Sequence, residues 1–118
     1  MNRLIIAGQP RPDPAPVTDY PRPERLVSGN PRRQTGSCYE SGPMSAGFWE
    51  CEPGAWRIVF ADNKQEFFQV IHGRVRLHDA DGGYQDIGPG DAAVIPPGFQ
   101  GVFEVLDAVR KYYVIVEI

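Results

Sequence analysis

The chain has 118 residues, 42% of them hydrophobic, and a formal net charge of −3 at pH 7. This length predicts a single domain with one hydrophobic core, and the composition excludes both a disordered chain and a membrane protein. The slightly acidic balance argues against nucleic acid as a partner, because phosphate binding requires a basic face.

The compartment is indicated by the first residues and by the cysteines. The apolar run Leu4 to Ala7 is shorter than the roughly 7–15 residues of a signal-peptide core. We therefore expect a cytoplasmic protein. Cys38 and Cys51 are the only cysteines, and a reducing compartment would keep them as two thiols.

Residues 1–31 differ in composition from the rest of the chain. Seven of the twelve prolines lie here: Pro10, Pro12, Pro14, Pro16, Pro21, Pro23 and Pro31. Proline removes backbone donors and blocks helix, so this segment is predicted to be irregular and to carry no core of its own. We expect an N-terminal arm, 1–31, that docks on the barrel or on a partner subunit, followed by a single domain, 32–118.

From Ala46 onward, short apolar or alternating runs are separated by Gly, Pro, Asp and Asn. No ten-residue window has helical periodicity, and alternation with turn residues at this spacing indicates an all-β barrel or sandwich with at most one short helix. The expected strands are residues 47–51, 56–60, 66–71, 74–77, 84–87, 92–95, 102–106 and 111–118. Gly73 is expected to form a tight hairpin turn between the third and fourth of these strands.

Two spaced motifs identify the fold more closely. The spacing G-x5-H-x-H-x3-E-x6-G is matched at Gly54, Phe60, Asp62, Glu66 and Gly73. The spacing G-x5-P-x-G-x2-H is matched at Gly90, Pro96, Gly98 and Gly101. These are the two conserved motifs of the cupin superfamily, which residues 46–117 resemble. Segments 47–54, 66–73 and 88–99 are similar to the small single-domain branch related to the cupin domain of (S)-ureidoglycine aminohydrolase. The resemblance implies a double-stranded β-helix, that is, a jelly-roll barrel, and a homodimer.

The resemblance also implies a metal site, from which this sequence departs. The family binds manganese, iron, nickel or zinc through histidines and a glutamate, yet Phe60, Asp62 and Gly101 stand at the histidine positions and Glu66 alone is kept. Imidazole is the ligand that suits these metals. We therefore predict a degenerate metal site and no metal cofactor. The alternative is a divalent metal held by Glu66 and Asp62, with Gln100 as a further ligand.

Glu66 is the residue of greatest interest for binding. The motif register turns it into the barrel, together with Phe68 on the same strand. A buried carboxylate is costly unless it is protonated, hydrated or paired, and the candidate partners are Arg57, Arg110 and Lys111. The predicted ligand-binding set is Glu66, Phe60, Phe68, Trp56 and Phe103. Glu66 either contacts a ligand in a cavity opened by Gly101 or is a relic that a barrel hydrogen bond retains.

His72 and His78 are predicted to lie on the surface, the first beside a turn and the second on a polar strand face. Three functions stay open. The leading hypothesis is a metal-independent barrel that binds a small polar metabolite, and the second is a divalent-metal enzyme related to the aminohydrolase. The third, a metal-free epimerase or isomerase, is least favoured because such chemistry needs a base like histidine inside the barrel.

Overall fold

The computed structural model describes residues 2–8 and 15–118, and it consists almost wholly of antiparallel strands. In chain order these are β1 (Val17–Asp19), β2 (Leu26–Ser28), β3 (Arg33–Ser41), β4 (Met44–Cys51), β5 (Gly54–Val59), β6 (Lys64–Asp79), β7 (Tyr84–Ile87), β8 (Ala92–Ile95) and β9 (Gln100–Glu117). One turn of 3-10 helix, η1 (Pro23–Arg25), is the helical element of the described residues. The all-β prediction is confirmed.

The long strands β6 and β9 pair along their whole length and form the spine of the molecule. The sequence predicted two strands in place of each, with a hairpin turn at Gly73. That prediction is wrong: Gly73 lies inside β6, in a bulge where the β6–β9 register shifts. Gly73 has a φ of +84°, and a Cβ there would collide with the backbone of Ala108 and Val109. A bulge bends a strand without ending it, so both long strands fold over at this point.

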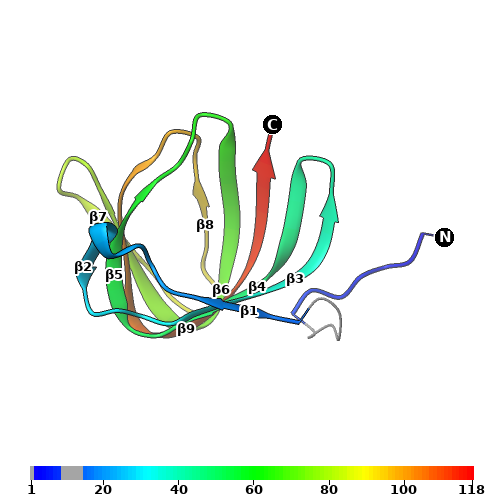
Figure 1. Cartoon of the computed structure of the whole chain (residues 1–118), viewed down its shortest axis with the longest axis horizontal. Coiled ribbons are helices and arrows are strands. Elements are labelled where there is room, and N and C mark those ends of the chain that lie inside the picture. Colours follow the sequence, from blue (N-terminus) through cyan, green and yellow to red (C-terminus); the bar gives the residue numbers. More distant parts are fainter. Residues whose placement is uncertain (1, 9–14) are drawn as a thin grey trace.

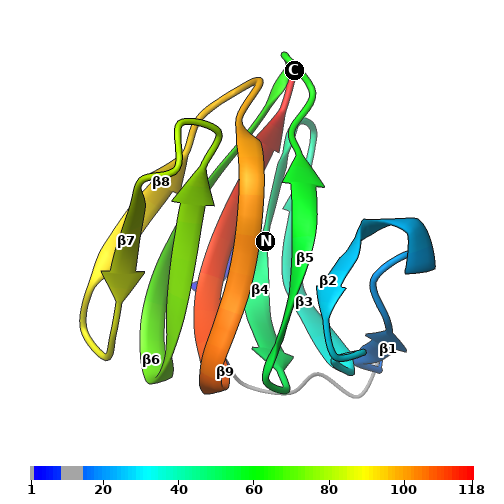
Figure 2. The same cartoon turned by 90° about the vertical axis from the view of Figure 1, so that its left-hand side faces the viewer.

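Folding the spine produces two facing layers (Figures 1 and 2). The first layer holds β1, β3 and β4, the C-terminal half of β9, the N-terminal half of β6, and β8. The second layer holds β2 and β5, the N-terminal half of β9, the C-terminal half of β6, and β7. Residues of both layers point into the space between them, which is the jelly-roll arrangement predicted from the two motifs.

The interior is almost completely closed to solvent where β6 and β9 fold over. Val70, Val75, Val105 and Val109 are almost completely buried there, and we call these four residues the bend. Inward-facing residues of β6 are even-numbered before Gly73 and odd-numbered after it, because the bulge adds one residue and reverses the alternation. The bend is therefore a direct result of the bulge.

The N-terminal arm docks on the barrel of its own chain. Its strand β1 pairs with β3, β2 pairs with β5, and Pro31 is fully buried. The arm is therefore only partly irregular; Pro10, Pro12 and Pro14 lie outside the described residues. The sequence did not predict β3, because its polar composition and Gly36 hide the alternation that indicates a strand.

Cys38 and Cys51 are buried and no disulfide joins them, as expected for thiols. Burial raises the pKa of the Cys51 thiol to about 12, against the opposing fields of Arg33 and Lys111. None of the helical structure in the described residues is long and apolar enough to cross a membrane.

Candidate functional site

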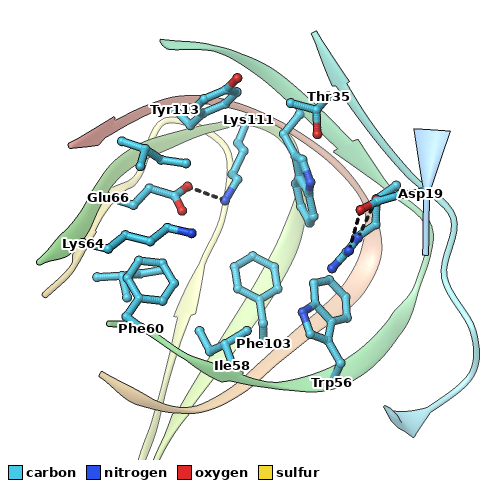
Figure 3. Close-up of a pocket in the computed structure, with 14 residues that line it drawn as sticks. Asp19, Thr35, Trp56, Ile58, Phe60, Lys64, Glu66, Phe103, Lys111 and Tyr113 are labelled. Carbon is cyan, nitrogen blue, oxygen red and sulfur yellow. Dashed lines mark hydrogen bonds and ion pairs between the residues drawn. The ribbon is translucent and has the colours of Figure 1, made fainter. Parts of the chain in front are cut away.

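A cavity of about 290 Å³ lies between the two layers, next to the bend. Fourteen residues line it (Figure 3). They are Asp19, Arg33, Thr35, Trp49, Trp56, Ile58, Phe60, Lys64, Glu66, Ile95, Phe103, Lys111, Tyr113 and Ile115. Its volume is at the small end of the range for ligand sites, about 300–1,000 Å³.

The two layers give this cavity two chemically different walls. Every charged lining residue belongs to the first layer: Asp19 on β1, Arg33 on β3, Lys64 and Glu66 on β6, and Lys111 on β9. The facing wall, from β5 and the start of β9, is formed by Trp56, Ile58 and Phe103, and Phe60 follows β5. Trp56 and Phe103 stack with ring centroids 5.3 Å apart, so this wall offers a flat apolar surface.

Glu66 and Lys111 form a buried ion pair on the polar wall. The Lys111 ammonium Nζ donates to Glu66 Oε2 at 2.7 Å, and the two residues are only 5% and 8% exposed. Lys111 faces Val70 in the β6–β9 register, while Glu66 faces Ile115. The long lysine side chain therefore reaches along the sheet to the carboxylate. Of the three cationic partners that the sequence offered, Lys111 is the one the fold brings to Glu66.

Aromatic rings surround the Lys111 ammonium. Its Nζ lies 4.3 Å from the ring centroid of Phe68, 4.6 Å from that of Trp49 and 5.0 Å from that of Phe103. Ring faces attract a cation electrostatically, most strongly where water is excluded. One carboxylate and three rings thus hold the Lys111 side chain in a defined position.

A second ion pair joins the N-terminal arm to the same cavity. Arg33 and Asp19 lie opposite each other in the β1–β3 register. The Arg33 guanidinium donates two hydrogen bonds to the carboxylate, at 2.9 and 2.8 Å, which is the strong two-point geometry of such pairs. The guanidinium also lies 5.2 Å from the centroid of Trp56. The arm therefore contributes directly to the cavity wall.

Lys64 differs from the other two cations of the cavity. Among the described residues its ammonium has no hydrogen-bond acceptor or carboxylate partner. Its Nζ lies 4.9 Å from the ring centroid of Phe60. Lys64 is half-buried at the start of β6, and Figure 3 shows its amine turned toward the middle of the cavity.

The structure brings together most of the predicted ligand-binding set. Glu66, Phe60, Trp56 and Phe103 line the cavity. Phe68 is fully buried beneath it and contacts the Lys111 ammonium instead. The residues that the sequence did not select, above all Lys64, Arg33 and Asp19, could have been found in part from strand alternation. Lys64 shares the parity of Glu66, whereas Arg33 and Asp19 depend on strand pairing that no local pattern reveals.

The metal alternative is not favoured by the placement of its residues. Asp62 and Gln100 are exposed and do not line the cavity, and Phe60 contributes a ring in place of an imidazole. Gly101 does not open space for a ligand. The ring of Phe99 and the carbonyl oxygen of His78 occupy the place that a side chain would take. Within the described residues no group of three or more His, Cys, Asp and Glu is placed to hold a metal ion. The donor set therefore does not fit the metal that the motifs imply.

Three further titratable groups are His72, His78 and Tyr113. His72 is exposed, and a ring nitrogen of the half-exposed His78 lies 2.8 Å from Glu104 Oε1. Both histidines are outside the cavity, as predicted. Burial raises the pKa of the Tyr113 hydroxyl, and the charges of Cys38, Glu40 and Glu66 add to the effect, so Tyr113 is neutral at physiological pH.

Residues 39–113 match the EutQ-like cupin domain family, which is more than half of the chain. The chain belongs to the EutQ-like cupin family. The match covers β4 to β8, most of β9 and the last three residues of β3, and it includes Glu66 and Lys111. The cupin superfamily assignment made from the two motifs is thereby confirmed. A search of curated proteins finds no match.

Solved structures support the same fold for this EutQ-like cupin. A protein of unknown function from Pseudomonas syringae pv. tomato is 21% identical, with a TM-score of 0.77 over 91% of this chain and 46% of its own. A putative ethanolamine utilization protein Q from Salmonella typhimurium is 22% identical, with a TM-score of 0.64 over 72% and 69% of the two chains. Ectoine synthase from P. lautus gives 14% identity and a TM-score of 0.64, over 72% and 64%. This chain thus spans about half the length of the Pseudomonas protein.

Proposed function

We propose that this EutQ-like cupin is a metal-independent barrel that binds a small polar metabolite. The observation that carries the proposal is the buried Lys111–Glu66 pair, at 2.7 Å. A carboxylate in such surroundings needs a positive charge close by. In metal-binding cupins the ion supplies that charge, whereas here an ammonium group of the chain itself supplies it.

The cavity also has the form of a binding site. It places charged and polar groups on one wall and stacked aromatic groups on the other, within about 290 Å³. A mostly apolar pocket with a few fixed polar groups is the usual form of a small-molecule site. The Lys111 and Arg33 side chains are held by ion pairs before any ligand enters, so binding would cost little side-chain entropy.

The competing enzyme hypothesis requires a divalent metal at Glu66. For that, Lys111 would have to leave a position fixed by one carboxylate and three rings, and Asp62 and Gln100 would have to turn inward. A homodimer and a cytoplasmic location remain part of the proposal. The dimer is tested by light scattering, where a monomer mass of about 13 kDa would contradict it.

The test of the proposed function is ligand binding by protein treated with a chelator and dialysed. A metabolite library is scanned by thermal shift, and hits are titrated with and without added manganese, iron, nickel or zinc. We expect hits that raise the melting temperature equally in both series. Hits that appear only after metal addition would support the enzyme, and a library without any hit would refute a binding function.

Glu66→Gln separates a ligand contact from a relic. If Glu66 helps to bind the ligand, directly or by holding Lys111, the variant loses the shift that a hit produces in the wild type. If Glu66 is a relic that has no part in binding, the shift is unchanged. Glu117→Gln, which makes the same substitution at an exposed site outside the cavity, is the matched control and should leave the shift unchanged.

A further inference from the structure

The charges of the cavity do not balance. Three cationic side chains, Arg33, Lys64 and Lys111, face two carboxylates, Asp19 and Glu66. The cavity thus carries one positive charge in excess, although the chain as a whole has a net charge of −3. The excess is local and lies on the wall that faces the aromatic groups.

The excess charge belongs to one residue. Arg33 is neutralised by Asp19 through two hydrogen bonds, and Lys111 is neutralised by Glu66. The Lys64 ammonium lies over the ring of Phe60. Among the described residues, no carboxylate pairs with it and no group accepts a hydrogen bond from it. An ammonium group has three donors, and a half-buried one gains from an anion that replaces its lost water.

We infer that the ligand of this cavity is a small monocarboxylate with a flat or branched apolar body. The inference rests on the proposed function and names its ligand class. The carboxylate pairs with the Lys64 ammonium, and the apolar body lies on Trp56, Ile58 and Phe103 across the cavity. The two walls thus match the two halves of such a molecule.

The same charges select against other ligands. A cation would lie against the excess positive charge and would find both carboxylates already paired. A dianion would bring one negative charge more than Lys64 neutralises, close to Glu66 and Asp19. A neutral amide of the same shape would keep the apolar contacts and lose the charge-assisted hydrogen bond, which costs about tenfold or more in affinity.

The experiment compares three probes of nearly equal shape: benzoate, benzamide and benzylammonium. Each is titrated into metal-free protein while the indole N–H signals of Trp56 and Trp49 are followed by NMR. We expect benzoate to bind at least tenfold more tightly than benzamide and benzylammonium to bind most weakly. Equal affinities for benzoate and benzamide, or a preference for benzylammonium, would overturn the inference.

Two variants test whether the Lys64 ammonium is the group that pairs with the carboxylate of benzoate. Lys64→Gln should reduce benzoate affinity about tenfold or more and leave benzamide affinity unchanged. Arg74→Gln removes the same charge from an exposed site outside the cavity and should change neither by more than twofold. If both variants lost the same amount of benzoate affinity, the preference for benzoate would come from the overall charge of the protein. The proposed role of Lys64 would then be refuted.

The two proposals fail differently. If neutral metabolites bind the metal-free cavity and carboxylates do not, the ligand class is wrong while the binding function stands. If benzoate and every library compound fail to bind, both are wrong. Lys64→Arg, which keeps the charge, should retain the preference for benzoate, and its loss there would also contradict the inference.

Discussion

The bend and the cavity are neighbouring parts of one interior, and β6 and β9 contribute to both, yet they are different environments. At the bend, Val70, Val75, Val105 and Val109 exclude water with aliphatic side chains alone. Next to it, the cavity contains five charged groups and an accessible volume of about 290 Å³. An aliphatic core would have been the simpler way to fill that volume. The bend has the composition of a structural core, and the charged cavity beside it is where the proposed binding function is placed.

The largest expected effect on stability comes from removing one member of the buried Glu66–Lys111 pair. Lys111→Met leaves the Glu66 carboxylate without a partner in a site that is less than a tenth exposed. We expect a loss of about 3–5 kcal/mol in the free energy of unfolding, the usual cost of a buried unpaired charge. Urea denaturation followed by tryptophan fluorescence measures it.

The double variant Lys111→Met/Glu66→Leu removes two of the five charged groups of the cavity and makes it more like the bend. Replacing both partners of a buried pair by apolar groups is often neutral or stabilising by about 1–4 kcal/mol. The double variant should therefore recover the stability lost in the single one. Equal destabilisation in both would show that the contacts of Lys111 with the rings, rather than its pairing with Glu66, hold this wall in place.

Gly73→Ala tests the bulge that creates the bend. The left-handed φ costs about 1–2 kcal/mol for a residue with a Cβ, and the collision with the Ala108 and Val109 backbone adds overpacking of about 1–3 kcal/mol. We expect a loss of about 3 kcal/mol by thermal or chemical denaturation. Gly82→Ala is the control, because its φ is +89° but nothing lies within 4 Å of the added Cβ. Equal losses would mean that packing against β9 does not matter.

Cys51, which faces Val109 across β4 and β9, reports whether the interior beside the bend stays dry. A pKa of about 12 instead of 9.0 lowers the thiolate fraction at pH 8, and therefore the reactivity, by roughly a thousandfold. In a Cys38→Ala background, alkylation should be slow in the native state and fast in urea. Because the folded pKa is raised, the stabilising contribution of the neutral thiol is complete below pH 9 and is lost as the pH rises toward 12. Rapid native alkylation would contradict a water-free interior.

The bend and the cavity were not equally predictable from the sequence. Strand alternation correctly predicted that Glu66, Phe68, Trp56 and Phe103 point inward, because side-chain direction within a strand is a local property. The turn residues predicted an all-β barrel or sandwich, and the resemblance of the two spaced motifs to the cupin superfamily predicted the jelly roll.

What failed depends on pairing between distant segments. The bulge at Gly73 has the composition of a turn, and only its contact with Ala108 and Val109 distinguishes the two. The sequence left three cationic side chains as candidate partners of Glu66. The register between β6 and β9 decides which of them lies close to it, and that register cannot be derived from a local pattern. Arg33 and Asp19 come from segments whose polar composition hides their strands.

The smallest expected effect on stability concerns an ion pair on the outer surface, which serves as the exposed counterpart of Glu66–Lys111. Arg76 donates to both oxygens of Asp86, at 2.7 and 3.0 Å, and this hydrogen bonding holds the Asp86 pKa below its ordinary 3.8. A lowered folded pKa contributes stability above the unfolded pKa and loses it as the pH falls through the folded value. Solvent screens such a pair, so Arg76→Gln should barely change the melting temperature at pH 7.

Arg76→Gln should nevertheless raise the Asp86 pKa in a carboxyl NMR titration. Arg74→Gln removes a weaker influence on Asp86 and should raise that pKa less. A melting temperature that falls as far as in Lys111→Met would show that burial is not what separates the two pairs, and the contrast between the cavity and the surface would be lost.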